Sequence, residues 1–451
     1  MKKVFGLFIS LIVLMGLSAC EKGYSTLTFV ASGESSVTLV KVGEPFDISL
    51  EYSMDGKNWK PYTIGETIFL LDDKLSFRAE ESGNKRFSKG DDNYYQFVFS
   101  GEIAARGSIM SLLDRSDRKN VIPSYAFYSL FSDCAGLTEA PELPSTKLAS
   151  NCYFRMFEDC TSLTIAPVLP ATNLTEGCYM QMFVGCTKLT TAPELPAIDL
   201  DKGCYSQMFY GCTGLTKAPE LPATNLAEGC YMQMFVGCKS LKKAPELPAT
   251  ELAKNCYESM FKGCTSLTKA PVLPATVMAS DCYYDMFSGC TSLTEAPELP
   301  AITLAERCYG GMFYGCTSLT EASALPATKL AKSCYEAMFE GCKSLTKAPA
   351  LPATELVSSC YSWMFYDCTS LTKAPALPAT KLASSCYSWM FHDCTNLNYV
   401  KALFTDEPSY ETTFNWLLGV APTGTFVKSK DATWDVWGVY GIPYGWIVVT
   451  E

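Results

Sequence analysis

The chain has 451 residues and a formal net charge of −11, with 48% hydrophobic and 18% charged residues. This composition is far from that of a disordered chain and supplies enough apolar surface for a continuous core. The acidity argues against nucleic acid as a partner, because nucleic-acid binding needs a basic surface.

The N-terminus has the pattern of a secretory signal. Two lysines precede an apolar run over residues 4–17, which is about the length of a signal-peptide core and too short to span a bilayer comfortably. Residues 17–20, Leu-Ser-Ala-Cys, resemble the lipobox of bacterial lipoproteins. The resemblance implies that residues 1–19 are a lipoprotein signal peptide, that Cys20 carries the lipid, and that residues 20–23 are anchor and tether. The mature chain is then expected outside the cytoplasm, attached by its lipid to a membrane, at the outer membrane or cell surface of a Gram-negative bacterium.

Residues 24–107 alternate apolar and polar side chains with a period of two, which is typical of half-buried β-strands. About seven short strands in this length predict a small β-sandwich of immunoglobulin-like type. We expect it to act as a spacer and N-terminal cap for the following segment, with an independent binding module as the alternative. The clearest expected strands are residues 26–29, 36–40, 46–52, 68–71, 75–79 and 94–99.

A 26-residue pattern dominates the rest of the chain. The unit CYMQMFVGCTKLTTAPELPAIDLDKG, residues 178–203, recurs with few changes as far as CYSWMFHDC, which begins at residue 386. A fixed period of this length marks a solenoid, in which each unit buries its apolar face against its neighbours. We assign residues 108–420 to this solenoid and the aromatic segment 421–451 to a C-terminal cap.

Each unit predicts a short helix followed by a short strand. Nearly every residue before the first cysteine belongs to the helix N-cap set, and Gly or Asp stands before the second cysteine, where a helix stop is expected. Between them, Cys-Tyr-x-x-Met-Phe spaces its apolar residues for one helix face. The next segment, Leu-Thr-x-Ala, runs into a proline, so its parallel strand must be short. The predicted fold class is an α/β solenoid.

The unit resembles the BspA-like leucine-rich repeats of bacterial surface proteins. Residues 182–189, Met-Phe-Val-Gly-Cys-Thr-Lys-Leu, follow the family theme Ala-Phe-x-x-Cys-x-x-Leu, with Met in place of Ala. Cys178 stands where that family usually has Ile. The resemblance covers residues 126 to about 420 and implies a leucine-rich-repeat solenoid on a cell surface, often linked to adhesion. It implies no catalytic residues.

Most of the 22 cysteines form pairs eight residues apart within the units. On the predicted helix the two Cα atoms lie ~10 Å apart, beyond the ~7 Å that a disulfide allows. The first unit has Ala126 in the leading position, and a small apolar substitute suits a buried site. We therefore expect two columns of buried free thiols, with intra-repeat disulfides as the alternative and no metal site, because metal-ligand spacings are missing. The columns include Cys178, Cys186, Cys204, Cys212, Cys230 and Cys238.

No residues form a recognisable catalytic set. His392 is the only histidine and occupies a position filled elsewhere by residues such as Val184 and Tyr210, so we interpret it as a solvent-facing variable site. Motifs of serine hydrolases, phosphate-binding loops and zinc proteases are missing. Recurring carboxylates such as Glu194 and Glu220 stand in identical surroundings, unlike the paired carboxylates of glycosidases, and are interpreted as a solvated charge ladder. We expect no enzyme, no cofactor and no metal.

The variable positions are where a partner could bind. Trp363 and Trp389 replace small residues such as Ala337 at one position of the unit, with Tyr366 and His392 nearby on the same two units. Such aromatics are either binding anchors or packing for the C-terminal cap. Our leading hypothesis is a non-enzymatic, monomeric surface lipoprotein whose solenoid mediates adhesion or binds a protein or glycan. The alternative is a structural spacer without a ligand of its own.

Overall fold

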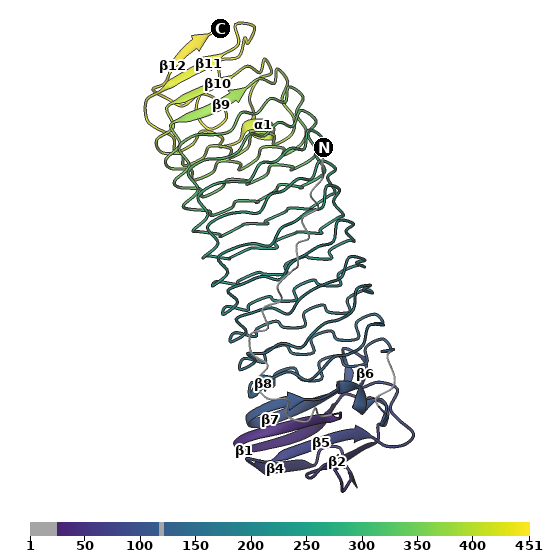
Figure 1. Cartoon of the computed structure of the whole chain (residues 1–451). Helices are drawn as coiled ribbons and strands as arrows, with labels where there is room; N and C mark the ends of the chain where they lie inside the picture. The colour runs from purple at the N-terminus through teal and green to yellow at the C-terminus, as the bar shows by residue number, and fades with distance from the viewer. Residues whose placement is uncertain (1–24, 117–120) are drawn as a thin grey trace, which may run out of the picture.

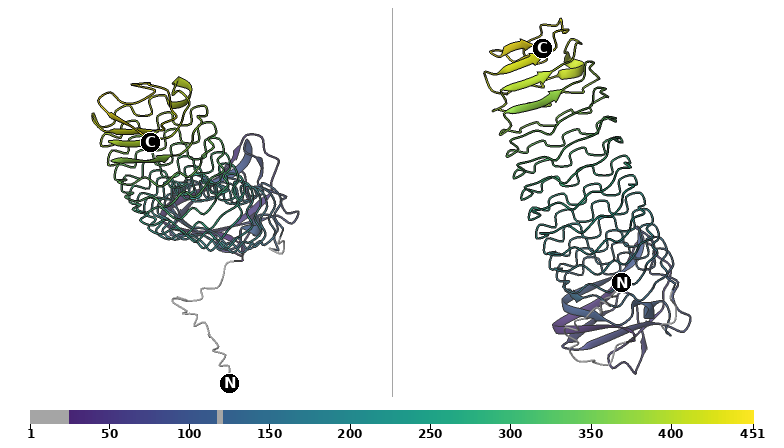
Figure 2. Two further views of the ribbon diagram at one scale, coloured as in Figure 1. Left: turned by 90° about the horizontal axis from the view of Figure 1, so that it is seen from above. Right: turned by 45° about the horizontal axis from the view of Figure 1, so that its top comes forward.

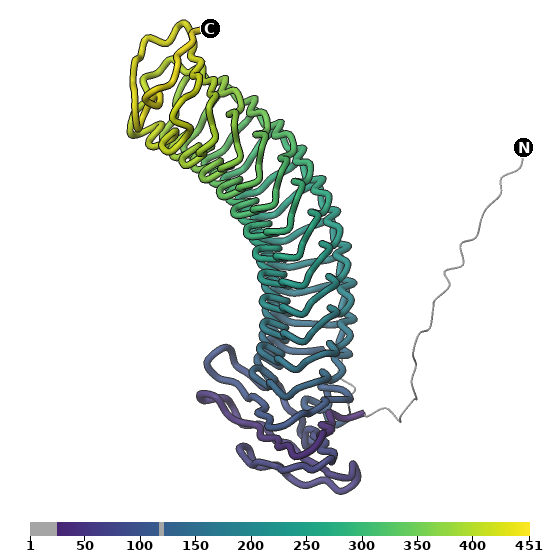
Figure 3. The backbone as a smooth tube through the Cα atoms, turned by 90° about the vertical axis from the view of Figure 1, so that its left-hand side faces the viewer, coloured from purple at the N-terminus to yellow at the C-terminus, as the bar shows by residue number. Residues whose placement is uncertain are grey.

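The computed structural model describes residues 25–116 and 121–451. The predicted signal peptide, Cys20 and the tether at residues 20–23 lie outside these ranges. The described chain is a stack of similar coils with a β-sheet at its N-terminal end and a short parallel sheet at its C-terminal end (Figures 1 and 2). The stack bends along its length (Figure 3). Among the described residues, no helix has the length and apolar character needed to cross a membrane.

The N-terminal sheet is built around two long antiparallel strands, β1 and β7. Their pairing runs from Thr28 opposite Arg106 to Val42 opposite Tyr94, with an irregularity after Ser32. The sheet order is β3-β2-β5-β1-β7-β6, with β4 also paired to β1 and β8 to β7. Its strands are β1 (Leu27–Val42), β2 (Leu50–Ser53), β3 (Lys60–Pro61), β4 (Thr67–Leu71), β5 (Lys74–Ala79), β6 (Ser88–Gly90), β7 (Asn93–Arg106) and β8 (Leu137–Glu139).

The structure does not show the immunoglobulin-like sandwich expected at residues 24–107. The seven strands of this segment lie in one hydrogen-bonded sheet that also contains β8, the first strand of the solenoid. Ile103 lies opposite Leu137 in the parallel β7–β8 pair, and the rings of Phe97 and Phe131 stack at 5.3 Å. The apolar face of the sheet is thus covered by the first coil, in place of a second sheet. The N-terminal segment therefore closes that end of the stack.

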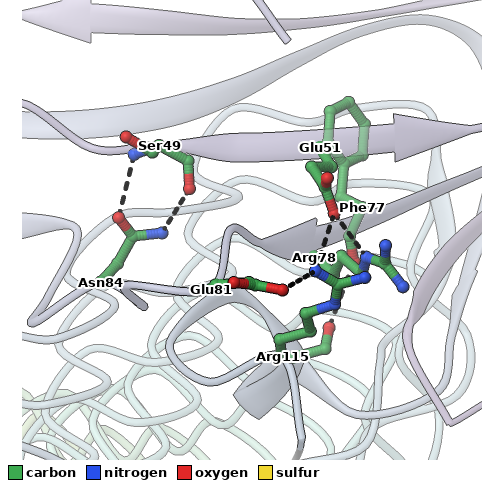
Figure 4. Close-up of polar contacts among 8 residues, drawn as sticks. Ser49, Glu51, Phe77, Arg78, Glu81, Asn84 and Arg115 are labelled. Carbon is green, nitrogen blue, oxygen red and sulfur yellow. Dashed lines mark hydrogen bonds and ion pairs between the residues drawn. The ribbon is translucent and has the colours of Figure 1, made fainter. Parts of the chain in front are cut away.

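Polar contacts fix the joint between this sheet and the chain that follows it (Figure 4). The Asn84 side-chain amide donates to the carbonyls of Ser49 (3.0 Å) and Leu112 (2.9 Å), and its oxygen accepts the Ser49 N–H. Leu112 ends the 3-10 helix η1 (Ile109–Leu112), which leads into the first coil. Nearby, Arg78 Nε donates to a Glu51 carboxylate oxygen at 2.7 Å. One buried amide thus ties Ser49, the residue before strand β2, to the start of the solenoid.

The short helix predicted in each unit is wrong, because the segment is a series of turns. Every fourth residue has a positive φ, as at Asn151 (56°), Arg155 (55°) and Asp159 (54°). The N–H of Met156 donates to the carbonyl three residues earlier, whereas the N–H of Arg155 donates to Met180 in the next coil. The backbone N–H groups therefore alternate in role along the coil. One closes a turn within the coil, and the next donates a hydrogen bond to the neighbouring coil. A helix would direct all of them along its own axis.

These turns still bury the residues that the pattern marked as apolar. In each full unit both cysteines, the tyrosine, the methionine and the phenylalanine are almost inaccessible to solvent. Tyrosine rings of successive coils stack at 5.7–6.0 Å between centroids. Phenylalanine rings stack at 5.5–5.7 Å. Each coil therefore covers the rings of the coil before it, as a solenoid requires.

The strand side of the units is mostly reduced to single bridges. Thr191 pairs with Lys217 in the next coil, and other units repeat this contact. The proline that follows the segment directly, Pro193 after Thr191 and Ala192, limits its ladder, since proline donates no hydrogen bond. Regular parallel strands form only in the last coils and at β8, and α1 is the only α-helix of the described ranges. These elements are β9 (Lys373–Leu377), β10 (Tyr399–Ala402), α1 (Tyr410–Thr413), β11 (Thr425–Lys428) and β12 (Ile447–Thr450).

Residues 421–451 continue the stack after the repeat pattern has decayed. Strands β11 and β12 add to β10 in parallel register. The Trp434 ring stacks on Phe404 at 5.2 Å, and its indole N–H donates to the Phe404 carbonyl. The indole of the buried Trp416 donates to the Gly441 carbonyl at 2.9 Å. This segment therefore covers the last apolar coil, and the buried indole N–H groups there have hydrogen-bond acceptors.

Candidate binding site

Trp363, Tyr366, Trp389 and His392 form one cluster, which we call the aromatic patch. The two indoles stack at 4.7 Å with an interplanar angle of 8°, and Tyr366 stacks on His392 at 4.9 Å. His392 also lies 4.7 Å from Trp389. All four side chains are partly exposed. The structure therefore brings together the four residues that the sequence singled out, on two adjacent coils.

The backbone at the tryptophans is set by the fold. Trp363 and Trp389 have φ values of 62° and 61°, and the Trp363 N–H donates to the Ser388 carbonyl in the next coil. A left-handed conformation costs a non-glycine residue roughly 1–2 kcal/mol, and Gly311 occupies the same position without that cost. The local backbone therefore gives no reason for tryptophan here, and the reason lies in what the side chains contact.

His392 is less exposed than the sequence predicted. Its side chain retains 12% of its accessible surface, between Trp389 and Tyr366. Its Nδ1 lies 3.2 Å from Asp393 Oδ2, but the geometry does not make a hydrogen bond, and this nitrogen has no partner among the described residues. The neighbouring aromatic rings, which the sequence pattern could not place, cover the imidazole.

The two tryptophans have different surroundings on their outer sides. Trp389 contacts Phe414 of the last coil edge to face at 5.4 Å, so it packs toward the C-terminal segment. In the coil before Trp363, Ala337 stands at the equivalent position, and its N–H donates to the Ser362 carbonyl. Packing of the C-terminal coils thus accounts for Trp389, whereas the equivalent position next to Trp363 in the preceding coil holds only a small residue.

Carboxylates border this face of the patch. Burial, reinforced by the negative charges of Asp367 and Glu336, raises the pKa of Glu340 to about 7. Asp367 forms an ion pair with Lys343 at 3.1 Å. Within the described ranges, no lysine or arginine forms an ion pair with Glu340 or Glu336. The sequence pattern did not single out these two glutamates. In an alignment of the units, however, Glu340 occupies the position in the preceding unit that is equivalent to Tyr366.

Shallow hollows line the strand side of the solenoid. Adjacent units enclose spaces of about 390, 440 and 470 Å³ between their Ala-Pro-x-Leu-Pro segments, from Thr191 to Pro274. Lys217 and Glu220 are exposed there, as the predicted charge ladder requires. The linings repeat almost unchanged from unit to unit, with lysine and glutamate side chains such as Lys217 and Glu220 among the prolines. These hollows therefore offer much less chemical selectivity than the aromatic patch.

The 21 cysteines of the described chain are buried and unpaired in the structure. Cys186, Cys212 and Cys238 belong to a column in which each Sγ donates to a phenylalanine carbonyl of the preceding coil at 3.0–3.1 Å. Cys178, Cys204 and Cys230 belong to the leading column. The distance argument based on a helix no longer applies, because there is no helix. The thiols instead fill apolar positions, and the trailing thiols also satisfy carbonyls.

We expect about 21 thiols to react with a thiol reagent in denaturant without reductant, and few of them in the native protein. Burial raises the pKa of Cys212 to about 12, and the same cause acts along both columns. The reactive thiolate is therefore scarce at neutral pH. A spectrophotometric titration, with and without prior reduction, measures both numbers. Thiols that appear only after reduction would show disulfides and contradict the free-thiol columns.

No group of three or more histidine, cysteine or acidic side chains in residues 25–116 and 121–451 is placed to hold a metal ion. The aromatic patch also lacks an activated nucleophile. The Nδ1 of His392, the only imidazole of the patch, accepts or donates no hydrogen bond among the described residues, so no base–orienter pair is formed through it. The chemistry available at the patch is stacking, cation–π attraction and hydrogen bonding to carboxylates.

Comparison with protein families identifies the repeat. The model of the BspA type leucine-rich repeat region matches in six copies over residues 179–303 and 299–414. These matches span more than half of the chain and include the aromatic patch. Comparison with curated proteins and with solved structures found no match. The chain therefore belongs to the BspA type leucine-rich repeat family.

Proposed function

We propose that this protein is a non-enzymatic surface protein that binds a protein or glycan through the aromatic patch of its solenoid. The supporting observation is the clustering of Trp363, Tyr366, Trp389 and His392, with both tryptophans at a position where the other full units carry small or polar side chains. Tryptophan and tyrosine dominate the hot spots of interfaces. The proposal includes display outside the cytoplasm by a lipid on Cys20, which the lipobox-like residues 17–20 support.

A structural spacer is the second candidate function. The almost unchanged ring columns between Tyr153 and Phe391 favour it, because a spacer needs repetition and no distinct site. The two candidates differ in whether the aromatic patch contributes binding.

The purified protein should capture a ligand from a panel of extracellular matrix proteins or a glycan array. We expect the variant Trp363→Ser to reduce this capture about tenfold, as for a hot-spot residue. Tyr210→Ser is the matched control, because Tyr210 is 41% exposed at the position that Tyr366 occupies in its own unit. Equal effects of the two variants would show that the patch is not the binding site. Failure to bind any matrix protein or glycan would favour the spacer.

A further inference from the structure

We propose that the aromatic patch takes a lysine or arginine side chain of a protein partner, seated on the open face of Trp363 beside Glu340 and Glu336. This inference rests on the proposed function, because it gives the partner chemistry of the same patch. It follows from three features of the patch: an indole whose neighbour on one side is a small residue, a second small residue at the next equivalent position, and carboxylates without a counter-charge.

The open face is the side of the Trp363 indole turned away from Trp389. On the Trp389 side the indoles stack almost in parallel at 4.7 Å. On the other side the equivalent position holds Ala337, in the coil directly hydrogen-bonded to that of Trp363. Aromatic faces carry negative potential and attract cations, and indole does so most strongly.

Small residues occupy the two preceding equivalent positions next to this face. After Ala337 the next equivalent position is Gly311, which has no side chain, and the Asp285 carboxylate leans over it. A Cβ on Gly311 would lie only 2.0 Å from Asp285 Oδ1. Asp285 is itself paired with Lys262 at 2.6 Å. The row of equivalent positions thus runs from the Trp363 indole through Ala337 to Gly311, where a carboxylate that already has a lysine partner lies over the backbone.

The negative charge next to Trp363 favours a cation as the ligand. Asp367 and Asp285 have lysine partners, but Glu340 and Glu336 have no basic partner in the part of the chain that the structure describes. The negative neighbours contribute to the raised pKa of Glu340, and an incoming cation would relieve that repulsion. The overall charge of −11 also steers basic partners toward the protein. A glycan would gain the stacking contact but would leave the carboxylates uncompensated.

Binding of a fluorescently labelled oligo-arginine peptide to the purified protein tests the inference. Trp363→Ala and Glu340→Gln should each weaken binding about tenfold, because each removes one half of the site. Glu246→Gln is the matched control, since it removes the same charge from an exposed position on the strand side and should change affinity by less than about twofold. Equal losses from Glu340→Gln and Glu246→Gln would mean attraction by net charge alone and would overturn the inference.

The pH dependence of peptide binding distinguishes a specific role of Glu340 from attraction by the net charge of the protein. Glu340, with a pKa raised to about 7, loses its proton as the pH rises from 6 to 8, so peptide binding should strengthen over that range. The charged groups that face it are Glu336 and Asp367, the latter paired with Lys343. Glu340→Gln should remove the dependence, whereas His392→Gln should retain it. A dependence lost only in His392→Gln would contradict the role of Glu340.

The same variants separate this inference from the proposed function. Capture of a matrix protein or glycan that falls with Trp363→Ala but not with Glu340→Gln would leave the binding function in place and overturn the basic partner. Capture that falls with both variants and is displaced by the oligo-arginine peptide would support both proposals.

Discussion

The variant Phe261→Ala is expected to lower the free energy of unfolding by about 3–5 kcal/mol, the range for removal of a buried aromatic ring. Phe261 is inaccessible to solvent and stacks between Phe235 and Phe287, at 5.6 Å from each. Its carbonyl also accepts the Cys290 thiol. The neighbouring coils cannot close the cavity readily, because their spacing is fixed by hydrogen bonds on both sides of the ring.

Urea unfolding followed by far-ultraviolet circular dichroism measures this loss. The control Val272→Ala removes apolar atoms from a side chain that is 79% exposed, so its effect should stay within about 0.5 kcal/mol. A loss below about 1 kcal/mol for Phe261→Ala would mean that the phenylalanine column adds little to the stack. A separate early transition would instead show that the coils on either side of Phe261 unfold independently.

The sequence predicted the buried side chains of the coil but not its backbone. Apolar pairs recur at a spacing of four residues, which differs from the helical period by only ~40° of rotation over one spacing. Over two turns the two periods cannot be told apart. The Gly, Asn and Asp residues before each cysteine tolerate a positive φ, as well as suiting the ends of a helix. The sequence pattern predicts helix caps at these positions, whereas Gly203 and Gly211 are both left-handed turn residues.

The middle turn position explains why the backbone could not be predicted locally. Arg155, Gln207 and Trp363 carry no local signal for a positive φ, yet all three adopt it. Each donates its N–H to the following coil, as Gln207 does to Met232 at 2.8 Å. Contacts between coils therefore override local preference. The same limit applies at the N-terminus, where the strands could be predicted but the β7–β8 pairing depends on a distant segment.

The aromatic patch could be predicted in part because its four residues share positions in adjacent units. An alignment of the units places Glu340 and Glu336 in the unit before the patch, but the effect of these charges on the patch depends on how the coils stack. The raised pKa of Glu340 depends on burial and on Asp367, which lies 27 residues further along the chain. In a solenoid the environment of a side chain is set by residues about one repeat away.

Deletion of residues 421–451 is expected to have the largest effect, because it uncovers the last apolar coil. Phe404 and Trp416 are inaccessible to solvent and are covered by Trp434, Phe426 and β11. Uncovering one face of each ring exposes roughly 200 Å² of apolar surface, which corresponds to about 5 kcal/mol at ~25 cal/mol per Å². The truncated protein should melt at a lower temperature over a broader range, bind a hydrophobic dye and associate.

The point variant Trp434→Ala keeps this prediction testable if the truncated protein fails to fold. It removes the ring stacked on Phe404 and the indole donor to the Phe404 carbonyl, but leaves β11 and β12 in place. It should cost about 3–5 kcal/mol. Tyr444→Ala is the control, since Tyr444 lies in the same segment but is 76% exposed. Calorimetry and dye binding measure all three variants. An unchanged melting temperature after the deletion would contradict the assignment of residues 421–451 as a cap. The coil that contains β10 would then be stable without the aromatic contacts from this segment.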